Sequence, residues 1–503
     1  MSIRVWILLS GVMPLAFGGT ARANDETADS DEEGLEKGAD VTLQGVSRIE
    51  DLDLWDLLDL ETGVASLTMM GLRESPSLVT VITADEIAAS GARDLVDVLA
   101  LVPGIQFVTD TWNFVGFAIR GIHGVEGKVL VLLDGHELPE TMYSTVPMGG
   151  RFPVEQIERV ELIRGPGSVV YGEYAEMAVV KITTRSGGES RGGLAHGVVG
   201  STAEGVSRYS GGGYVHQDLG ASIYLTHSLR SDREYVDVYG STWDMSKDSG
   251  LDAKTASLHL GSDQVRLDLH AEHYDTTHRD GYDYVVDQTQ ASNFRSYHGL
   301  FEAYLKLSDK ATLTPRIQLK HERAWHSTLN VEPSDFDYYE PLAERATAGL
   351  HGTFDPSDTL NVIAGLEGMV DAAQVTDAML QSSWDFDGNT SIVYYNGALY
   401  AQGILRLPKA PVIVIGARGD WHSKYGLSLV PRVAVTKAWD FAHFKAAYGR
   451  AFRPPGIENA NYSPDLEPEA ADTFEAEGGV RLGRISYLTA SLFWFDLHDP
   501  VQY

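Results

Sequence analysis

The stretch IERVELIRGPGSVVYGEYAEMAVVKITTRSGG, from Ile157 to Gly188, joins two regions whose residue patterns differ. Val160 to Ile163 is a short apolar run that predicts a strand, and Ala178 to Thr183 predicts a second one. Between them, Arg164 to Ser168 reads RGPGS, where the glycines permit a close backbone approach and the proline stiffens the turn. An ordinary Gly/Pro loop is the alternative for this turn, so the flanking regions decide its meaning.

The region before this stretch has the pattern of a compact α/β domain. Residues 76–83 predict a strand, and Thr83 with Glu86 has the spacing of a capping box, which predicts a short helix that ends at Gly91. A second helix is indicated by apolar residues at helical spacing, namely Leu95, Val98, Leu99 and Val102, and it is expected to stop at Pro103-Gly104.

Two further strands complete this predicted domain. They are expected at Phe117 to Arg120 and at Val129 to Leu133, and the Asp134-Gly135 turn ends the second of them. The sequence therefore predicts one domain from Ser75 to Gly188, and its length of about a hundred residues is an ordinary domain size.

After Gly188 the pattern changes to apolar and polar residues in strict alternation. Val265, Leu267, Leu269 and Ala271 alternate with Arg266, Asp268, His270 and Glu272, while Leu313, Ile317 and Leu319 alternate with Thr312, Thr314, Arg316, Gln318 and Lys320. A helix with this sequence would carry charge on every face, so the pattern predicts strands with one apolar and one polar side. Such alternation is required of a membrane barrel whose strands face lipid on one side and the lumen on the other.

Short and long connections alternate between these strands. Short turns are expected at His216 to Asp218, Gly261 to Asp263, Ser308 to Lys310, Asp355 to Asp358, Leu407 to Ala410 and Trp439 to Asp440. Longer connections are expected at Arg230 to Gly250, Asp275 to Arg295, Trp325 to Glu340, Asp371 to Asn389, Asp420 to Gly426 and Phe452 to Pro468. Short turns at one rim and long loops at the other are typical of outer-membrane barrels and not of soluble sandwiches.

Composition excludes several classes of protein. The chain has 503 residues, no cysteine, and a net charge of -32, which argues against nucleic acid as a partner. We interpret the acidic charge as solvated loops and turns, with attraction of cations as the alternative. The mean hydropathy is -0.14, and no apolar run after the N-terminus is long enough for a helical membrane anchor.

The N-terminus predicts secretion. Arg4 is followed by an apolar stretch from Val5 to Phe17 and by Ala21-Arg22-Ala23, so we expect a signal peptide at residues 1–23 that is cleaved near Ala23. Residues 24–50 are rich in acidic residues and are expected to form a disordered extension. Residues 51–74 follow as a separate segment with apolar leucines and Trp55.

Five blocks, in this order, resemble the plug domain of TonB-dependent outer-membrane receptors. They are SLVTVITADEI (77–87), DLVDVLALVPGI (94–105), AIRGI (118–122), KVLVLLDG (128–135) and IERVELIRGPGSVVYG (157–172). The resemblance implies an α+β plug domain at residues 75–188, followed by an antiparallel transmembrane β-barrel at residues 189–503. At the end of the plug the family usually has a GVINIIT-like strand, whereas this chain has Ala178 to Thr183 with a lysine at position 181.

The resemblance also implies a role for specific plug residues. The motif positions that it marks are Arg120, Gly121, Asp134, Gly135, Arg164, Gly165, Pro166, Gly167 and Ser168. Ligand contacts are expected at the apical loops 111–115 and 143–148, where Trp112, Phe114 and Tyr143 are candidate stacking platforms. Packing of these rings against the barrel wall is the alternative.

The segment LDLWDLLDLETGVAS (52–66) resembles the stretch that precedes the plug in a large subgroup of the family, which marks Glu61, Thr62, Gly63, Val64 and Ala65 as a candidate TonB box. An extended segment of this kind can pair with a partner sheet through main-chain hydrogen bonds, and a plain linker is the alternative. The resemblance implies import of a scarce solute, a ferric siderophore-like chelate or else cobalamin or a glycan, energised by TonB. The expected partners are TonB, outer-membrane lipid and a small-molecule ligand, and the expected location is the outer membrane.

No pattern in the chain indicates an enzyme, a cofactor or a metal site. The stretch GRAFRPPGIENANYSPDLEPEAADTFEAE (449–477) resembles the FRAP and NPxL boxes of the family, and it lacks the histidine that haem-binding members have between these boxes. The histidines at 259, 270, 273, 278 and 298 are interpreted as polar lumen or rim residues, with a metal site as the alternative.

The number of strands is smaller than the resemblance implies. About fifteen strands are expected after Gly188, whereas plugged transporters close with about twenty-two. Pro500 and Asp499 also interrupt the apolar alternation expected of a final strand. Because an open edge leaves backbone groups unsatisfied in lipid, we expect a truncated or frame-interrupted receptor; a non-functional fragment and a non-transporting signalling or adhesion receptor remain alternatives.

Overall fold

The structure is a computed structural model of the chain. It describes residues 6–12, 61–65, 68–109, 114–124, 126–152, 154–185, 192–201, 207–217, 221–231, 234–236, 242–244, 248, 250–262, 264–280, 285–329, 339–376, 386, 388–483 and 486–501. In the described part of the chain, no helix combines the length and the apolar composition needed to cross a membrane.

The plug is built on a five-stranded mixed sheet in the order β4-β10-β11-β8-β9. Its strands are β4 (Leu78–Thr83), β8 (Val129–Leu133), β9 (His136–Glu137), β10 (Ile157–Arg164) and β11 (Ala178–Thr184). β10 pairs antiparallel with β4 and β11, and β11 pairs parallel with β8. All five residues of β8 are buried, as expected of a strand at the centre of a domain.

Two short helices cover this sheet. α2 (Ala84–Ser90) begins at the predicted capping box, in which the Thr83 hydroxyl accepts from the Glu86 amide and the Glu86 carboxylate accepts from the Thr83 amide, and it ends at Gly91 with a φ of 73°. α3 (Leu95–Ala100) buries Leu95, Val98 and Leu99 completely against the sheet. The predicted boundaries of both helices are confirmed to within two residues.

A smaller sheet, β5-β6-β7, lies beside α3. It consists of β5 (Ile105–Thr109), β6 (Val115–Ile119) and β7 (Ile122–His123), and a 3-10 turn, η2 (Val154–Gln156), precedes β10. β2 (Glu61–Thr62) and β3 (Met70–Gly71) form a separate hairpin ahead of the plug.

The stretch Ile157 to Gly188 contains one element that the sequence did not predict. After the turn at Gly165, residues Ser168–Tyr171 form a helical turn, α4, which packs against β24 to β27 of the large sheet. Val169 and Val170 are β-branched and read locally as strand, so tertiary packing overrides the local preference here.

The rest of the chain is a large antiparallel sheet. Its strands are β12 (Gly192–Ser201), β13 (Ser207–Gln217), β14 (Ala221–Ser231), β17 (Gly250–Gly261), β18 (Val265–Asp280), β19 (Val285–Ala303), β20 (Leu305–Ser308), β21 (Ala311–Leu329), β22 (Pro341–Ser357), β23 (Leu360–Val375), β24 (Ser391–Arg406), β25 (Val412–His422), β26 (Gly426–Trp439), β27 (Ala442–Arg453), β28 (Glu469–Arg481) and β29 (Tyr487–His498). With β20 taken as the continuation of β19 past Tyr304, the described strands of this sheet after Gly188 agree with the expectation of about fifteen.

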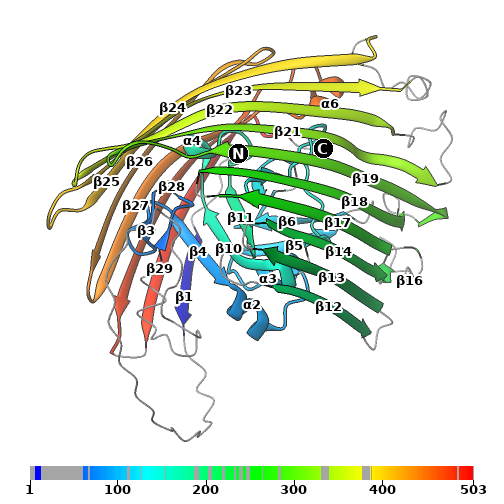
Figure 1. Ribbon diagram of the computed structural model, residues 1–503, viewed down its shortest axis with the longest axis horizontal. Helices are drawn as coiled ribbons and strands as arrows, with labels where there is room; N and C mark the ends of the chain where they lie inside the picture. Colours follow the sequence, from blue (N-terminus) through cyan, green and yellow to red (C-terminus); the bar gives the residue numbers. More distant parts are fainter. Residues whose placement is uncertain are drawn as a thin grey trace, which may run out of the picture.

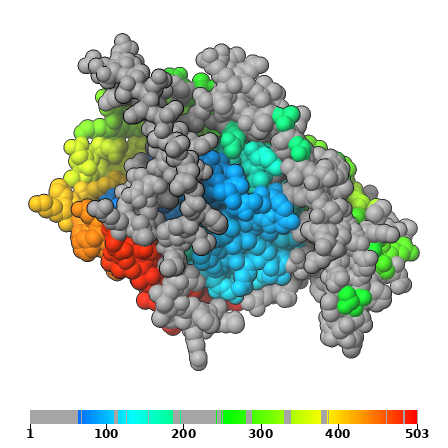
Figure 2. All heavy atoms as spheres, turned by 90° about the horizontal axis from the view of Figure 1, so that it is seen from below, coloured from blue at the N-terminus to red at the C-terminus, as the bar shows by residue number. Residues whose placement is uncertain are grey.

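Figure 1 shows the plug elements on the concave side of this curved sheet, and Figure 2, seen from below, shows the plug surface in blue and cyan at the middle of the molecule. Two small elements accompany the sheet: the hairpin of β15 (Glu234–Val236) with β16 (Thr242–Asp244), and α6 (Ile457–Tyr462) between β27 and β28.

The strand order is that of a closed barrel in which β1 (Trp6–Val12) lies between β29 and β12. β1 pairs antiparallel with β29, from Trp6 opposite Phe493 to Val12 opposite Tyr487. The strands after Gly188 form a closed ring only together with β1, and β1 lies in the predicted signal peptide. Cleavage near Ala23, which stays a prediction, would leave β12 and β29 as edges of the sheet.

The alternation of outward-facing and inward-facing residues is confirmed. Leu269, Ile317 and Leu319 are 43%, 49% and 56% exposed on the outer face, whereas Asp268 and Gln318 are 1% and 4% exposed on the inner face. The short turns after β20, β24 and β26 are confirmed as well. The predicted long connection Asp275 to Arg295 is wrong, because β18 and β19 extend through most of it and leave only residues 281–284 between them.

Candidate functional site

The candidate TonB box, Glu61 to Ala65, is docked between the plug and the large sheet. Thr62, Val64 and Ala65 are 1%, 1% and 2% exposed. The segment enters this position through the β2–β3 hairpin, in which Glu61 lies opposite Gly71 and Thr62 opposite Met70. The main chain is therefore covered at the positions where a partner strand would pair with it.

Three side chains hold the docked segment. The Thr62 hydroxyl donates to Glu161 Oε1 at 2.8 Å, and Tyr171 donates its phenol proton to the Val64 carbonyl at 2.7 Å. Arg432, on the inner face of β26, donates from Nη1 to the Ala65 carbonyl at 2.9 Å. Glu161 and Tyr171 belong to the plug, so both the plug and the barrel contribute to the hold.

Glu161, which accepts from Thr62, also forms ion pairs with two basic residues of the plug. Its side chain is 1% exposed and lies 3.4 Å from Lys181 Nζ and 3.6 Å from Arg159 Nε. Burial, together with the nearby Glu161 carboxylate, raises the pKa of Tyr171, so the phenol stays protonated and remains a donor to the Val64 carbonyl. Lys181 occupies the position where the family pattern has asparagine, and the structure places it against this carboxylate.

The predicted plug motif residues lie at the seam between plug and barrel. Arg120, with a φ of 54°, donates from Nη1 to Glu475 Oε1 at 2.5 Å, and its guanidinium lies 4.4 Å from the centre of the Phe493 ring. Gly121 follows at a φ of 81°. Both partners of the Arg120–Glu475 pair have side chains only 5% exposed, so breaking the pair would leave an uncompensated buried charge.

In the second half of the motif, residues 164–168, close packing explains the glycines at positions 165 and 167. A Cβ on Gly165, whose φ is 124°, would meet a carboxylate oxygen of Glu475 at 2.8 Å, and one on Gly167 would meet Val179 at 2.7 Å. Pro166 packs closely on Gly449 of β27. The buried Ser168 hydroxyl donates to the Ala175 carbonyl at 3.1 Å. Arg164, the last residue of β10, has a pKa lowered by burial and by Arg120.

Asp134 and Gly135 close the β8–β9 turn. The Asp134 carboxylate accepts from the amide of Thr184 at 2.8 Å and from its hydroxyl at 2.7 Å, and Gly135 has a φ of 88°. Arg266 and Arg316 of the barrel donate to the carbonyls of Asp134 and Gly135, the second at 2.5 Å. This turn is therefore another fixed contact between plug and barrel.

Further ion pairs cross the same seam. Lys128 pairs with Glu469, and Arg151 pairs with Glu272 through Nε at 2.5 Å and through Nη2. All four side chains are less than a tenth exposed. No pattern in the sequence indicated these pairs, because each joins residues more than a hundred positions apart.

The candidate ligand-contacting residues have different surroundings. Trp112 lies outside the described residues. Phe114 is 2% exposed, and its ring lies 5.3 Å from that of Trp325, which is itself covered by Phe294 at 4.6 Å. Tyr143 is half-buried with its ring 5.9 Å from Tyr339. Phe114 thus packs against the barrel wall, whereas Tyr143 packs against the same apolar cluster and remains partly exposed.

The histidines of the lumen are more clustered than the sequence indicates. His136 of the plug lies 6.3 Å from His270 and 5.7 Å from His298, measured between ring centroids, and these two barrel rings are 5.8 Å apart. Burial and the neighbouring His270 lower the pKa of His136 to about 2, so it stays neutral. Within the described ranges, no group of three or more His, Cys, Asp or Glu side chains is arranged to hold a metal ion.

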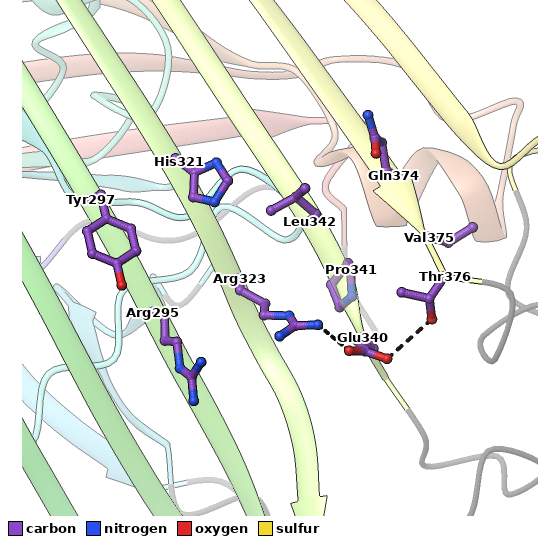
Figure 3. Close-up of a pocket in the computed structure, with 10 residues that line it drawn as sticks. All are labelled: Arg295, Tyr297, His321, Arg323, Glu340, Pro341, Leu342, Gln374, Val375 and Thr376. Carbon is purple, nitrogen blue, oxygen red and sulfur yellow. Dashed lines mark hydrogen bonds and ion pairs between the residues drawn. The ribbon is translucent and has the colours of Figure 1, made fainter.

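A pocket of about 380 Å³ opens on the outer face of β19, β21, β22 and β23 (Figure 3). Its charged lining residues are Arg295, Arg323 and Glu340, and Arg323 pairs with Glu340. Tyr297 and Leu342 form part of its wall. The pocket lies on the side of the sheet away from the plug.

Comparison with known proteins agrees with this architecture. Residues 71–179 match the TonB-dependent Receptor Plug Domain, and residues 195–503, more than half of the chain, match the TonB dependent receptor-like β-barrel. The chain is 24% identical to the ferrienterobactin receptor of Escherichia coli K12, over 80% of this chain and 63% of that protein. It is 34% identical to the vitamin B12 transporter BtuB of Vibrio vulnificus, over 28% of this chain and 23% of that protein.

Among solved structures, the siderophore receptor PirA of Acinetobacter baumannii is similar, with a TM-score of 0.64 at 18% identity over 84% of this chain and 71% of that one. At this identity the likeness concerns the fold. The chain spans less than two thirds of the length of the two curated relatives.

Proposed function

Since the chain belongs to the family of TonB-dependent receptors, we propose that it is an outer-membrane receptor that imports a scarce solute with energy delivered by TonB. The proposed cargo is a ferric siderophore-like chelate, and cobalamin or a glycan is the alternative. Relatives that bear the names ferrienterobactin receptor and vitamin B12 transporter support the first two of these. The family consists of receptors and transporters, not enzymes, and the proposal assigns no catalytic residue.

The observation that carries the proposal is the docking of Glu61 to Ala65. TonB would add this segment to its own sheet through main-chain hydrogen bonds. Two of the carbonyls needed, those of Val64 and Ala65, already accept from Tyr171 and Arg432. The segment must therefore leave its site before it can pair, which makes its release a step that cargo binding is able to control.

Cargo can favour release only if it binds the released state more tightly than the docked state. We assign cargo contact to the plug loops 111–115 and 143–148, with the Tyr143 ring as a stacking platform and Trp112 as a second candidate. Phe114, which is covered by Trp325, would support these loops from below. Outer-membrane lipid is the proposed surrounding of the sheet, with the signal peptide removed near Ala23.

Uptake and binding of a radiolabelled ferric chelate, with ferric enterobactin as the first probe, test this proposal in cells that carry the chain. Deletion of Glu61 to Ala65 is expected to abolish uptake above background and to leave surface binding within about twofold, because the segment acts after the cargo has bound.

The matched control removes five residues from the acidic stretch Asp25 to Glu36, which is expected to leave both binding and uptake unchanged. Uptake that continues after the deletion of Glu61 to Ala65 would reject the energised mechanism. Binding without uptake by the unaltered chain would instead favour a signalling or adhesion receptor.

A further inference from the structure

The pocket on the outer face of the sheet lies at the border between two zones of exposed side chains. On one side they are apolar and form a belt around the sheet, and on the other side they are charged. Along β19, Ser296 and His298 are 9% and 5% exposed and face the lumen, so Arg295 and Tyr297 face outward, and Tyr297 is 53% exposed. Figure 3 shows Arg295 and Tyr297 on one strand and His321 and Arg323 on the next, and all four side chains line the same pocket.

Four basic residues form a row across this outer face, here called the basic row: Lys254, His273, Arg295 and Arg323. The register of the sheet places them side by side, because Lys254 lies opposite His273, His273 opposite Arg295, and Arg295 opposite Arg323. Neighbouring strands are about 4.8 Å apart, so the row spans only about 15 Å of the sheet. Two arginines and a lysine are thus aligned on neighbouring strands of a chain whose net charge is -32.

The height of the basic row is set by the residues beneath it. Tyr297 lies two residues from Arg295 along β19, and Leu319 lies four residues from Arg323 along β21, which is about 13 Å at 3.3 Å per residue. Leu319, Leu269 and Phe301 are 56%, 43% and 39% exposed and belong to the outward apolar face. The row therefore borders the belt on the side of the long connections, the level at which lipid headgroups meet a barrel.

Three members of the row have an acidic partner, and Arg295 has none in the described part of the chain. Lys254 lies 2.8 Å from Asp252, His273 lies 3.3 Å from Asp275, and Arg323 pairs with Glu340. Arg295 forms no ion pair with any residue that the structure describes. Asp252 and Asp275 lie two residues further toward the rim than Lys254 and His273. The basic side chains are therefore closer to the apolar belt than these two carboxylates.

We propose that the basic row and its pocket bind the phosphate of a phosphorylated lipid headgroup in the membrane leaflet at the long-connection rim. Arg295 is the principal phosphate ligand, because its guanidinium forms no ion pair among the described residues, and Arg323, which pairs with Glu340 of the same pocket, adds a second guanidinium. Tyr297, Leu342 and Pro341 supply the apolar wall that a lipid requires and a free phosphate does not. The inference rests on the proposed placement in the outer membrane and is independent of cargo and of TonB.

Lipid retention by the full chain tests this inference. The chain is purified from membranes in detergent, exchanged into phosphatidylcholine nanodiscs that contain bis-phosphorylated lipid A, and the lipid A retained per protein is quantified by mass spectrometry. The double variant Arg295→Gln/Arg323→Gln is expected to bind lipid A roughly 30-fold more weakly, since each basic residue near a lipid surface contributes about 1 kcal/mol.

The matched control is Arg450→Gln, on β27 with a side chain 42% exposed and 3.9 Å from Asp472, which is expected to retain lipid A as the unaltered chain does. Dephosphorylated lipid A is expected to bind as weakly to the unaltered chain as lipid A does to the double variant. Equal retention by the unaltered chain and the double variant would overturn the proposal, as would complete displacement of lipid A by millimolar inorganic phosphate alone.

Folding of each variant is checked by far-UV circular dichroism. If the double variant fails to fold, Arg295→Gln carries the test, because its removal breaks no ion pair in the described part of the chain. Loss of cargo uptake with normal lipid retention would refute only the proposed function, so the two outcomes are distinguishable.

Discussion

Glu176 shows how a single buried carboxyl links the fold of the plug to pH. Its side chain is fully buried, between β10 and β11 of the plug in sequence, and it faces Glu469, Lys128 and Arg453. Burial and the Glu469 carboxylate raise the pKa of Glu176 to about 8, although Lys128 and Arg453 act in the opposite direction. At neutral pH the residue is therefore protonated in the folded chain.

This raised pKa predicts that the docked plug loses stability as pH rises. Below a pH of about 4.5 the carboxyl is protonated in both the folded and unfolded states, and its contribution is fully present. Between about 4.5 and 8 only the folded state holds the proton, so the free energy of unfolding falls by at most about 1.4 kcal/mol per pH unit. Hydrogen exchange of the β10 and β11 amides as a function of pH measures this.

The variant Glu176→Gln separates this effect from other titrations. It cannot ionise, so the part of the pH dependence between 4.5 and 8 that Glu176 causes is expected to disappear, while exchange at low pH stays close to that of the unaltered chain. An unchanged pH profile in Glu176→Gln would show that Glu176 is not the group responsible.

At the scale of elements, Glu61 to Ala65 is held by Arg432 of the barrel strand β26, Tyr171 of α4 and Glu161 of β10. Arg432 contacts both the Ala65 carbonyl and the Ser77 hydroxyl, the latter at 2.5 Å, so it ties the segment to the start of the plug sheet. Tyr171 reaches the Val64 carbonyl from the helical turn that packs against β24 to β27. The segment is thus sensitive to any shift of plug against barrel.

Replacement of Arg432 by Met is expected to loosen the segment without cargo. A hydrogen bond from a charged donor contributes about 1.5–3 kcal/mol, so amide exchange of peptides covering residues 61–71 is expected to rise at least about tenfold. Mass spectrometry of deuterated peptides measures this, and Tyr171→Phe is expected to give a smaller rise in the same peptides.

Arg418→Met is the matched control for this prediction. Arg418 is also a buried arginine on the inner face, on the neighbouring strand β25, but it pairs with Glu367 and Asp420 and not with the segment. Faster exchange of residues 61–71 in Arg418→Met to the same degree would mean that general loosening of the barrel, and not the Arg432 contact, controls the segment.

For the whole molecule, most of the architecture follows from sequence because it is periodic. The strands of the plug, the capping box at Thr83, and the alternation along β18 and β21 depend on local patterns, and each is confirmed. Two features were not predicted from the sequence: α4, and the extension of β18 and β19 through Asp275 to Arg295. Both depend on packing or pairing with other strands and not on a local pattern.

The site was less accessible to sequence reasoning than the fold. The motif positions Arg120 and Gly165 were identified by resemblance, but their partner Glu475 lies more than three hundred positions away and no local pattern connects them. The same holds for Arg432 and for the basic row, whose members come together only when the register of the sheet is known. Long-range pairing of this kind is a property of the folded sheet and not of any window of sequence.

The most direct test of release is the reactivity of a single thiol. The chain has no cysteine, so Thr62→Cys introduces a unique one at a position that is 1% exposed when the segment is docked. The measurement is the rate of labelling by a membrane-impermeant maleimide in outer membranes opened to the periplasmic side, with and without the bound ferric chelate. We predict slow labelling without cargo and a rise of at least about tenfold with cargo, which corresponds to about 1.4 kcal/mol of coupling. Equal labelling rates with and without bound cargo would contradict the account.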